Sequence, residues 1–247
     1  MLYIVGSLLG TQSGWPTSTW LGCCLQGGGG GRRLRGGLHL QFIHTDKIYS
    51  KGLHTMHTTD FIALDTETGG LDAAECALLS IAAVPSWDAP PFSVHILPVG
   101  RIDNKAAEVN GYTPEGWQKK GAVPLKIALL EMQRWLVDVR QARRFDMAAH
   151  NAGFDVLFML AAQARAGMDL NLPGVWHCTK IQMQEAHEAR RYKGAGRFRL
   201  DDLGRESGFW AQQPRAKEHD ALQDARCCKH GLLWLRGLAE KKEGGAA

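Results

Sequence analysis

The chain has 247 residues, 45% hydrophobic and 22% charged, and this ordinary composition excludes a wholly disordered, collagen-like or coiled-coil protein. No run of about 18 or more apolar residues occurs, so the sequence contains no candidate membrane-spanning helix. The net charge of +4 arises within residues 1–55, and the neutral remainder lacks the general basic character of many nucleic-acid-binding proteins.

Residues 1–57 are predicted to form a disordered, Gly-rich leader. The first 55 residues hold 12 of the 29 glycines and show no sustained helical or strand period. Three interpretations stay open: translation starting upstream of a true start such as Met56, a transit peptide, or a flexible tail. A single folded domain is expected over residues 58–240, followed by a flexible tail over 241–247.

The six cysteines indicate reduced thiols and a cytoplasmic protein. They form two adjacent pairs and two singletons, a spacing typical of neither a zinc site nor a disulfide framework. They are Cys23, Cys24, Cys76, Cys178, Cys227 and Cys228.

The folded part begins with short apolar runs that predict strands. Residues 61–64, 78–84 and 92–99 are such runs, and the connection between the last two is too short for a crossover helix. An antiparallel meander of three strands is therefore the simplest arrangement.

Helical periodicity and one further strand follow. Apolar spacing predicts a helix over 125–139, and residues 147–149 form a small fourth strand. Further helices are predicted over the ranges 156–166, 180–191 and 221–238. Strands followed by alternating helices and strands indicate an α/β protein with a mixed sheet covered by helices.

The strongest chemical signal is Asp65-Thr66-Glu67, directly after the first apolar strand. Residues i and i+2 of a strand share a face, so the two carboxylates are expected to project together. Such a pair repels unless a cation neutralises it, and oxygen ligands suit Mg²⁺ or Mn²⁺. A solvated turn is the alternative for this triplet alone.

Two later clusters add acids and a histidine. Asp155 follows His150-Asn151 and is expected in the first turn of a helix, where it is either a ligand or an ordinary helix-start acid. Asp224 falls inside an apolar helical segment, where an unpaired carboxylate is unfavourable. A partner at Arg226 or Lys229 is the alternative explanation for it. His219, just before that helix, is either functional or a solvent-exposed capping residue.

In this order, the three clusters resemble the DEDDh family of 3′–5′ exonucleases, which includes the proofreading subunit of bacterial DNA polymerase III and ribonuclease T. The resemblance covers about residues 61–238 and implies a ribonuclease H-like fold, with a mixed sheet of five strands. The positions that match the catalytic motif are Asp65, Glu67, Asp155, His219 and Asp224.

The resemblance also implies a mechanism. Asp65, Glu67, Asp155 and Asp224 would hold two Mg²⁺ or Mn²⁺ ions, and His219 would act as general base in phosphodiester hydrolysis. Substrate contacts are expected from Thr68, Gly69, Leu71, Asn151 and Phe154. Phe154 either stacks on a base or only seals the core. A basic stretch over residues 190–199 either guides phosphates or is an ordinary solvated loop.

The preferred interpretation is a 3′–5′ exonuclease acting on single-stranded DNA ends, in proofreading, repair or as a phage-type accessory enzyme. A DNA polymerase is then a candidate partner, and no membrane partner is expected. One alternative is an exoribonuclease that trims RNA 3′ ends. The sequence does not distinguish the two, because no residue indicates contact with a 2′-hydroxyl. The other is a non-catalytic module that associates with a polymerase, although the presence of all five motif positions argues against it.

Overall fold

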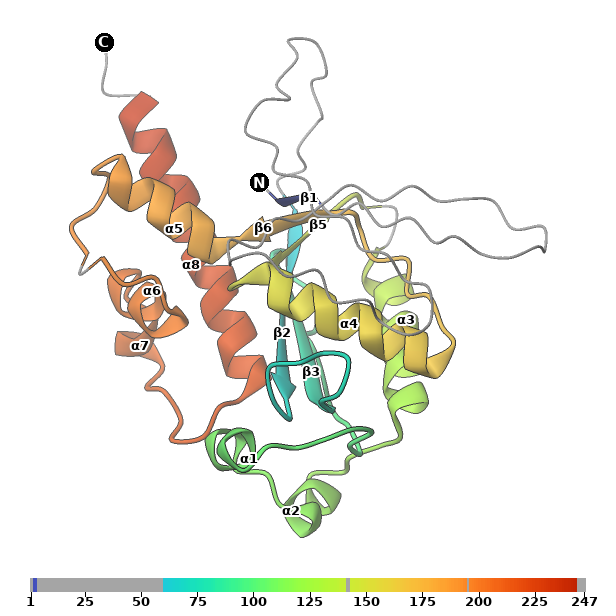
Figure 1. Ribbon diagram of the computed structural model, residues 1–247. Helices are drawn as coiled ribbons and strands as arrows, with labels where there is room; N and C mark the ends of the chain where they lie inside the picture. Colours follow the sequence, from blue (N-terminus) through green and yellow to red (C-terminus); the bar gives the residue numbers. More distant parts are fainter. Residues whose placement is uncertain (1, 4–59, 141–142, 195, 244–247) are drawn as a thin grey trace, which may run out of the picture.

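The computed structural model describes residues 2–3, 60–140, 143–194 and 196–243 (Figure 1). Strands and helices alternate over these ranges after an initial group of strands. In chain order they are β1 (Leu2–Tyr3), β2 (Phe61–Thr68), β3 (Leu78–Pro85), β4 (Phe92–His95), α1 (Asn104–Asn110), α2 (Pro114–Lys119), α3 (Leu125–Arg140), β5 (Asp146–Ala149), α4 (Ala152–Ala166), β6 (Val175–Cys178), α5 (Thr179–Glu188), α6 (Leu200–Glu206), α7 (Phe209–Gln212) and α8 (Ala221–Glu243).

The strands form one mixed sheet in the order β1-β6-β5-β2-β3-β4. β2, β3 and β4 make the predicted antiparallel meander, whereas β5 runs parallel to both β2 and β6. The predicted mixed sheet of five strands is therefore confirmed, and the two-residue β1 adds an antiparallel edge to β6. Because β2 and β5 are parallel, their carboxyl ends meet at one edge of the sheet, the usual place for a site in such folds.

Alternate residues of β2 pack on opposite faces of the sheet. Phe61 and Ala63 belong to a buried cluster that includes Leu232 of α8, whereas Ile62 and Leu64 belong to the main core formed with α3 and α4. Figure 1 shows α8 along one side of β2 and β3, with α4 on the other. All four of these β2 residues are fully buried, so the register of the strand is fixed by the apolar groups on both faces.

Several element ends differ from the sequence predictions. β2 continues past residue 64 to Thr68, and α4 begins at Ala152 rather than 156. β4 ends at His95 instead of 99, although Ile96 still bridges to Val123. The sequence pattern does not predict the short elements α1, α2, β6, α6 and α7.

The leader and tail predictions fall mostly outside the described residues. Only Leu2–Tyr3 of the leader is described, and α8 extends to Glu243 within the predicted tail. Among the described helices, none is both long and apolar enough to cross a membrane.

Candidate active site

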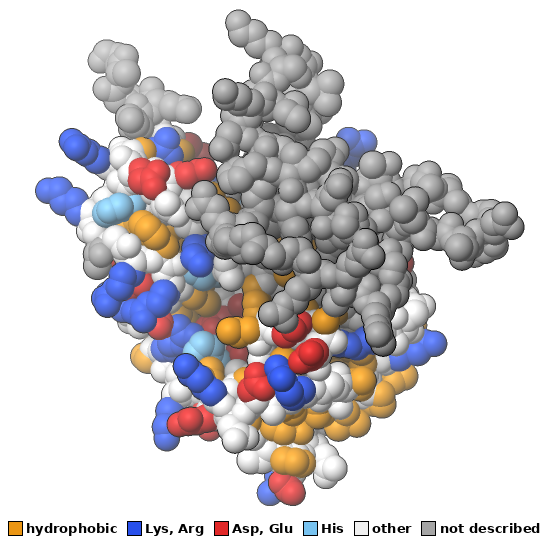
Figure 2. All heavy atoms as spheres, in the orientation of Figure 1, with side chains coloured by type: hydrophobic (Ala, Val, Ile, Leu, Met, Phe, Trp, Pro, Cys, Tyr) orange, Lys and Arg blue, Asp and Glu red, His pale blue; other side chains and the backbone are white. Residues whose placement is uncertain are grey.

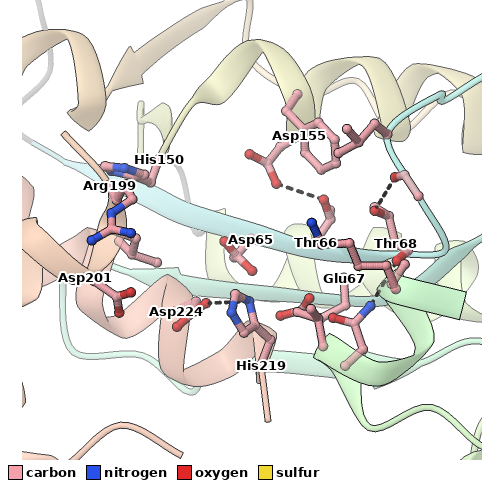
Figure 3. Close-up of a pocket in the computed structure, with 18 of the residues that line it drawn as sticks. Asp65, Thr66, Glu67, Thr68, His150, Asp155, Arg199, Asp201, His219 and Asp224 are labelled. Carbon is pink, nitrogen blue, oxygen red and sulfur yellow. Dashed lines mark hydrogen bonds and ion pairs between the residues drawn. The ribbon is translucent and has the colours of Figure 1, made fainter. Parts of the chain in front are cut away.

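A cavity of about 580 Å³ opens at the sheet edge where β2 ends and α4 begins (Figures 2 and 3). Its lining comes from β2 and the loop after it, α1, the first turns of α4, α6 and α8, and the loop before α8. The residues are Asp65, Thr66, Glu67, Thr68, Gly70, Leu71, Asp103, Lys105, Ala106, Val109, Asn110, His150, Phe154, Asp155, Arg199, Leu200, Asp201, Arg215, His219 and Asp224. Segments far apart in the sequence thus converge here.

Side chains of β2 alternate between the two faces of the sheet, and this alternation sets the direction of the polar side chains at the end of the strand. Asp65 and Glu67 continue the row of Phe61 and Ala63, which faces α8, so both carboxylates lie on one face as predicted. Thr66 lies in the opposite row, toward α4. A single strand therefore contributes polar groups on both sides of the sheet edge.

Asp155 lies in the first turn of α4, as expected. Its Oδ1 accepts a hydrogen bond of 2.8 Å from Thr66 Oγ1, so β2 positions this acid from the second row of the strand. Asp155 is only 2% exposed, and burial raises its pKa to about 7, although the Thr66 hydrogen bond opposes the rise. The Asp155 carboxyl group is thus held in place, and the hydrogen bonds to it do not fully offset the free-energy cost of burying its charge.

Asp224 and His219 come from the start of α8 and the loop before it. His219 Nδ1 lies 3.7 Å from Asp224 Oδ2, and donor atoms of Glu67, His219 and Asp224 all lie within 4.8 Å of one another. The His219 backbone N–H donates to Val109 O at 3.1 Å, which attaches this loop to α1. Figure 3 shows the His219 ring between Glu67 and Asp224. This arrangement is compatible with binding of a cation.

Asp224 has a different partner from those considered on the sequence. Its Oδ2 accepts a 3.0 Å hydrogen bond from Arg215 Nη2, neither Arg226 nor Lys229 being involved in this ion pair. The other guanidinium nitrogen, Nη1, pairs with Asp201 Oδ1. Two acids from different helices thus share one arginine from the loop before α8.

The acids are too crowded to be stable when all of them are ionised. Burial raises the pKa of Asp65 well above its ordinary value, and the neighbouring carboxylates of Asp155, Glu67 and Asp224 add to the rise. Burial, followed by the charge of Asp224, raises the pKa of Glu67 to about 8. The pKa of Asp224 rises to about 6 through burial, against the opposing charge of Arg215. These groups therefore favour a cation among them.

One atom of this cluster supports a metal site directly. Glu67 Oε1 is buried and has no hydrogen-bond partner among the described residues. An unpaired buried carboxylate oxygen is costly, and a hard divalent cation satisfies such an oxygen. The donor set therefore fits the Mg²⁺ or Mn²⁺ expected from the sequence.

The raised pKa values predict an unusual pH dependence of stability without metal. A carboxyl group whose pKa is raised on folding stabilises the fold at low pH, and this contribution is lost as the pH rises through the raised value. With pKa values of about 6, 7 and 8 for Asp224, Asp155 and Glu67, the Tm in EDTA is expected to fall between about pH 5 and pH 8. Differential scanning fluorimetry with and without Mn²⁺ measures this slope.

Two variants provide the control. Glu67→Gln removes the group with a pKa of about 8 and is expected to flatten the slope in EDTA, whereas Glu131→Gln, on the exposed side of α3, leaves it unchanged. Saturating Mn²⁺ is expected to remove the slope in the unmodified protein. A flat profile in EDTA, or equal slopes for the Glu67 variant and the unmodified protein, contradicts the account of the acid cluster.

His150 also lines the cavity, but both of its ring nitrogens are engaged. Nδ1 lies 2.9 Å from Thr179 Oγ1, and Nε2 lies 3.1 Å from Phe198 O. Burial lowers its pKa to about 4, so the ring is neutral and ties β5 to the segments around it. His219, by contrast, is exposed, and its partial burial and the charge of Arg215 lower its pKa.

The predicted substrate residues separate into two groups. Thr68, Leu71 and Phe154 line the cavity, and Leu71 is 87% exposed, which is unusual for so large an apolar side chain. Gly69 and Asn151 lie outside the lining. Gly69 has a packing role, since a Cβ there would lie 2.5 Å from the Arg101 carbonyl oxygen.

Asn151 begins α4 in the left-handed conformation, with φ of 67°. Its Oδ1 accepts a 3.5 Å hydrogen bond from Lys180 Nζ, at the first turns of α4 and α5. Asn adopts this backbone conformation more readily than most residues, which accounts for Asn151 without any contact to a ligand.

The sequence analysis missed four charged residues of the cavity: Asp103, Lys105, Asp201 and Arg215. Asn110 Nδ2 donates to Thr68 O at 2.9 Å and so attaches α1 to the end of β2. The position of Arg215, four residues before His219, was the available signal for its proximity to the site. Asp201 and Lys105 carry no such signal, because only the fold brings them to the cavity.

Known proteins resemble this chain in sequence. The family model RNase_T, described as "Exonuclease", matches residues 62–229. Ribonuclease T of Photorhabdus laumondii is 35% identical over 123 residues, covering 44% of this chain and 56% of the relative. Ribonuclease T of Escherichia coli K12 is 34% identical over 123 residues, covering 44% of this chain and 57% of the relative. The chain thus matches little more than half the length of these relatives.

Solved structures share the fold at lower identity. E. coli exonuclease I in complex with a dT13 oligonucleotide has a TM-score of 0.62 and 15% identity, covering 76% of this chain and 43% of that chain. Exonuclease I from Methylocaldum szegediense has a TM-score of 0.55 and 17% identity, covering 72% of this chain and 40% of that chain. The predicted ribonuclease H-like fold is confirmed by these likenesses. Because the family model matches more than half of its residues, the chain belongs to the exonuclease family.

Proposed function

We propose that this protein is a divalent-metal-dependent exonuclease that hydrolyses single-stranded nucleic acid from its 3′ end. The observation that carries the proposal is the cluster of Glu67, Asp224 and His219, whose donor atoms lie within 4.8 Å of one another in one cavity. The unpaired Glu67 Oε1 points to a cation as the missing partner. Membership of the exonuclease family supplies the reaction class.

The four acids have distinct proposed roles. Asp65, Glu67 and Asp224 would hold one cation, and Asp65 together with Asp155 would hold the second. When bound, the cations supply Lewis-acid chemistry, which lowers the pKa of water and offsets the charge that develops on the phosphate. The protein in turn supplies the positions of the oxygens, which Thr66 and the packing of β2 against α8 restrict.

His219 is the proposed general base. A base must be within reach of the attacking water and unprotonated at the working pH. The lowered pKa of His219 favours its neutral form, and its position at an exposed loop gives it access to solvent. His150 is a weaker candidate because its nitrogens are held at 2.9 and 3.1 Å, closer than the 3.4 and 3.7 Å contacts of His219.

The rim of the cavity supports binding of one strand end. Leu71 is proposed to pack against the terminal base, with Thr68 and Phe154 nearby. Lys and Arg side chains gather over α5 and α6 on the left of Figure 2. In the basic stretch, Arg190, Arg191, Lys193, Arg197 and Arg199 are all exposed, and Arg199 reaches the cavity lining. We propose that this stretch guides the phosphates of the strand.

DNA is the preferred substrate in this proposal, with proofreading or repair as the role and a DNA polymerase as the candidate partner. Exonuclease I, which shares the fold, has been solved with dT13 and dA16 oligonucleotides. A second candidate is an exoribonuclease, which the similarity to proteins named ribonuclease T favours. Both candidates use the same acid cluster and differ only in the sugar that they accept.

One assay tests the proposal. DNA and RNA oligonucleotides of equal sequence, labelled at the 5′ or 3′ end, are incubated with the full chain in Mg²⁺, Mn²⁺ or EDTA. We expect the 5′ label to remain on a ladder of shortening products and the 3′ label to be released at once as a mononucleotide, in Mg²⁺ or Mn²⁺ only. DNA is expected to be trimmed faster.

The alternative outcomes are distinct. Faster trimming of RNA supports the exoribonuclease, and release of the 5′ label first contradicts the proposed polarity. No trimming of either strand in any metal, with retained oligonucleotide binding, indicates the non-catalytic module instead. Asp224→Asn serves as the inactive control, because a contaminating nuclease would be unaffected by that change.

A further inference from the structure

Arg215 is a cation placed inside the acid cluster, and the roles proposed above do not use it. Its side chain is 21% exposed. Nη2 donates to Asp224 Oδ2 at 3.0 Å and lies 3.4 Å from His219 Nε2, while Nη1 pairs with Asp201 Oδ1. The guanidinium carbon lies 5.2 Å from the centre of the Trp210 ring. Nη1, Nη2 and the face of the guanidinium therefore contact different groups.

The carboxylate that Nη2 binds is also one that is proposed to hold a divalent cation. Asp224 Oδ2, which accepts the Arg215 hydrogen bond, is also the oxygen that faces His219 Nδ1 at 3.7 Å. A divalent cation on this carboxylate would lie within a few ångströms of the guanidinium, and at that separation two positive charges repel strongly. Arg215 and the metal therefore compete for Asp224.

Displacement from Asp224 does not free the whole side chain. Asp201 Oδ1 still holds Nη1, and the Trp210 ring still covers one side of the guanidinium. Nη2 then keeps only its 3.4 Å contact with His219 Nε2 and has donor capacity left at the wall of the cavity, beside the proposed metal site. A phosphate oxygen is the acceptor that an arginine in such a position binds well, because the group is planar and permanently charged.

We propose that Arg215 neutralises Asp224 in the metal-free protein and, once a divalent cation takes that carboxylate, binds a phosphate oxygen of the nucleic-acid strand. The first half concerns the metal site alone, and the second half rests on the proposed function. Loading of the metal would thereby create a phosphate contact that the metal-free protein lacks. Arg215 is thus assigned as a substrate-positioning residue.

The test measures two affinities, for Mn²⁺ and for the oligonucleotide, which the proposal predicts to change in opposite directions. Arg215→Met removes the competitor, so the metal-free variant is expected to bind Mn²⁺ about fivefold more tightly by isothermal titration calorimetry. The same variant loses the phosphate contact, so its KM for a single-stranded oligonucleotide at saturating Mn²⁺ is expected to rise about tenfold. A residue that only supported the fold would weaken both interactions together.

Two further variants control for charge and for loss of an arginine. Arg215→Lys keeps the charge but cannot bridge Asp201 and Asp224, so both shifts are expected at reduced size. Arg143→Met is the matched control, because Arg143 also pairs with an aspartate, Asp60, at 3.0 Å. Its guanidinium carbon also lies over a tryptophan ring, 5.5 Å from the centre of the Trp87 ring. Neither affinity is expected to change in it.

Each outcome decides the inference. Unchanged or weaker Mn²⁺ binding in Arg215→Met, or an unchanged KM, overturns it. If Arg215→Met does not fold, Arg215→Lys decides instead. An Mn²⁺ affinity and a KM equal to those of the unmodified protein in Arg215→Lys would overturn the inference, because a positive charge without the bridge to Asp201 and Asp224 would then explain both properties. If no protein trims the oligonucleotide while Mn²⁺ binding still tightens, the proposed function fails and the competition for Asp224 stands.

Discussion

Replacing Asp65 by Asn is expected to lower trimming by about a thousandfold or more, because this carboxylate is proposed to contact both cations. The same change is expected to raise the Tm of the metal-free protein. Burial and three neighbouring carboxylates raise the pKa of Asp65 well above its ordinary value, so its charge destabilises the fold near neutral pH. Asn has nearly the same shape and carries no charge.

The measurements are the rate of oligonucleotide shortening in Mg²⁺ and the Tm in EDTA and in Mn²⁺. The variant is expected to gain stability in EDTA and to lose most of the stabilisation that Mn²⁺ gives the unmodified protein. Asp138→Asn, at an exposed position of α3, is the control and should change neither quantity. A rate near that of the unmodified protein, or a fall of the Tm in EDTA, contradicts the role assigned to Asp65.

The sequence predicts the parts of this site that depend on local periodicity. The apolar run at 61–64 predicts a buried strand, and the period of two then places Asp65 and Glu67 on one face. The long helices α3 and α8 show apolar spacing over many residues, so their positions are predicted closely. The motif order adds Asp155 and His219 through family resemblance.

The sequence does not predict the parts that depend on tertiary contacts. α1 and α2 are seven and six residues long, too short for an informative period. α2 is held by Trp117, whose Nε1 donates to Leu79 O at 3.0 Å, and α1 by the bond from Asn110 to the end of β2. The pairing of Arg215 with Asp201 and Asp224 likewise joins a loop to two helices, so near neighbours such as Arg226 were the partners that sequence distance suggested.

Replacing His219 by Ala is expected to lower kcat by about a hundredfold to ten-thousandfold, the range for loss of a general base, with little change in Mn²⁺ affinity. The physical reason is that His219 lies at the edge of the acid cluster on an exposed loop, where it can take a proton without being needed to hold the cation. Because protonation inactivates a base, the kcat of the unmodified protein should fall at acid pH. The lowered pKa of His219 places that fall below the ordinary value of 6.5. The variant should lack this acid limb.

The closeness of His219 to Glu67 and Asp224 also permits a direct ligand role, and the same variant separates the two. A ligand contributes to binding in the absence of substrate, so its loss would weaken Mn²⁺ binding by calorimetry as much as it lowers kcat. A base contributes only during reaction, and added imidazole should then restore part of the rate without affecting Mn²⁺ affinity. Equal losses of kcat and Mn²⁺ affinity, with no rescue by imidazole, would show that His219 holds the cation rather than the proton.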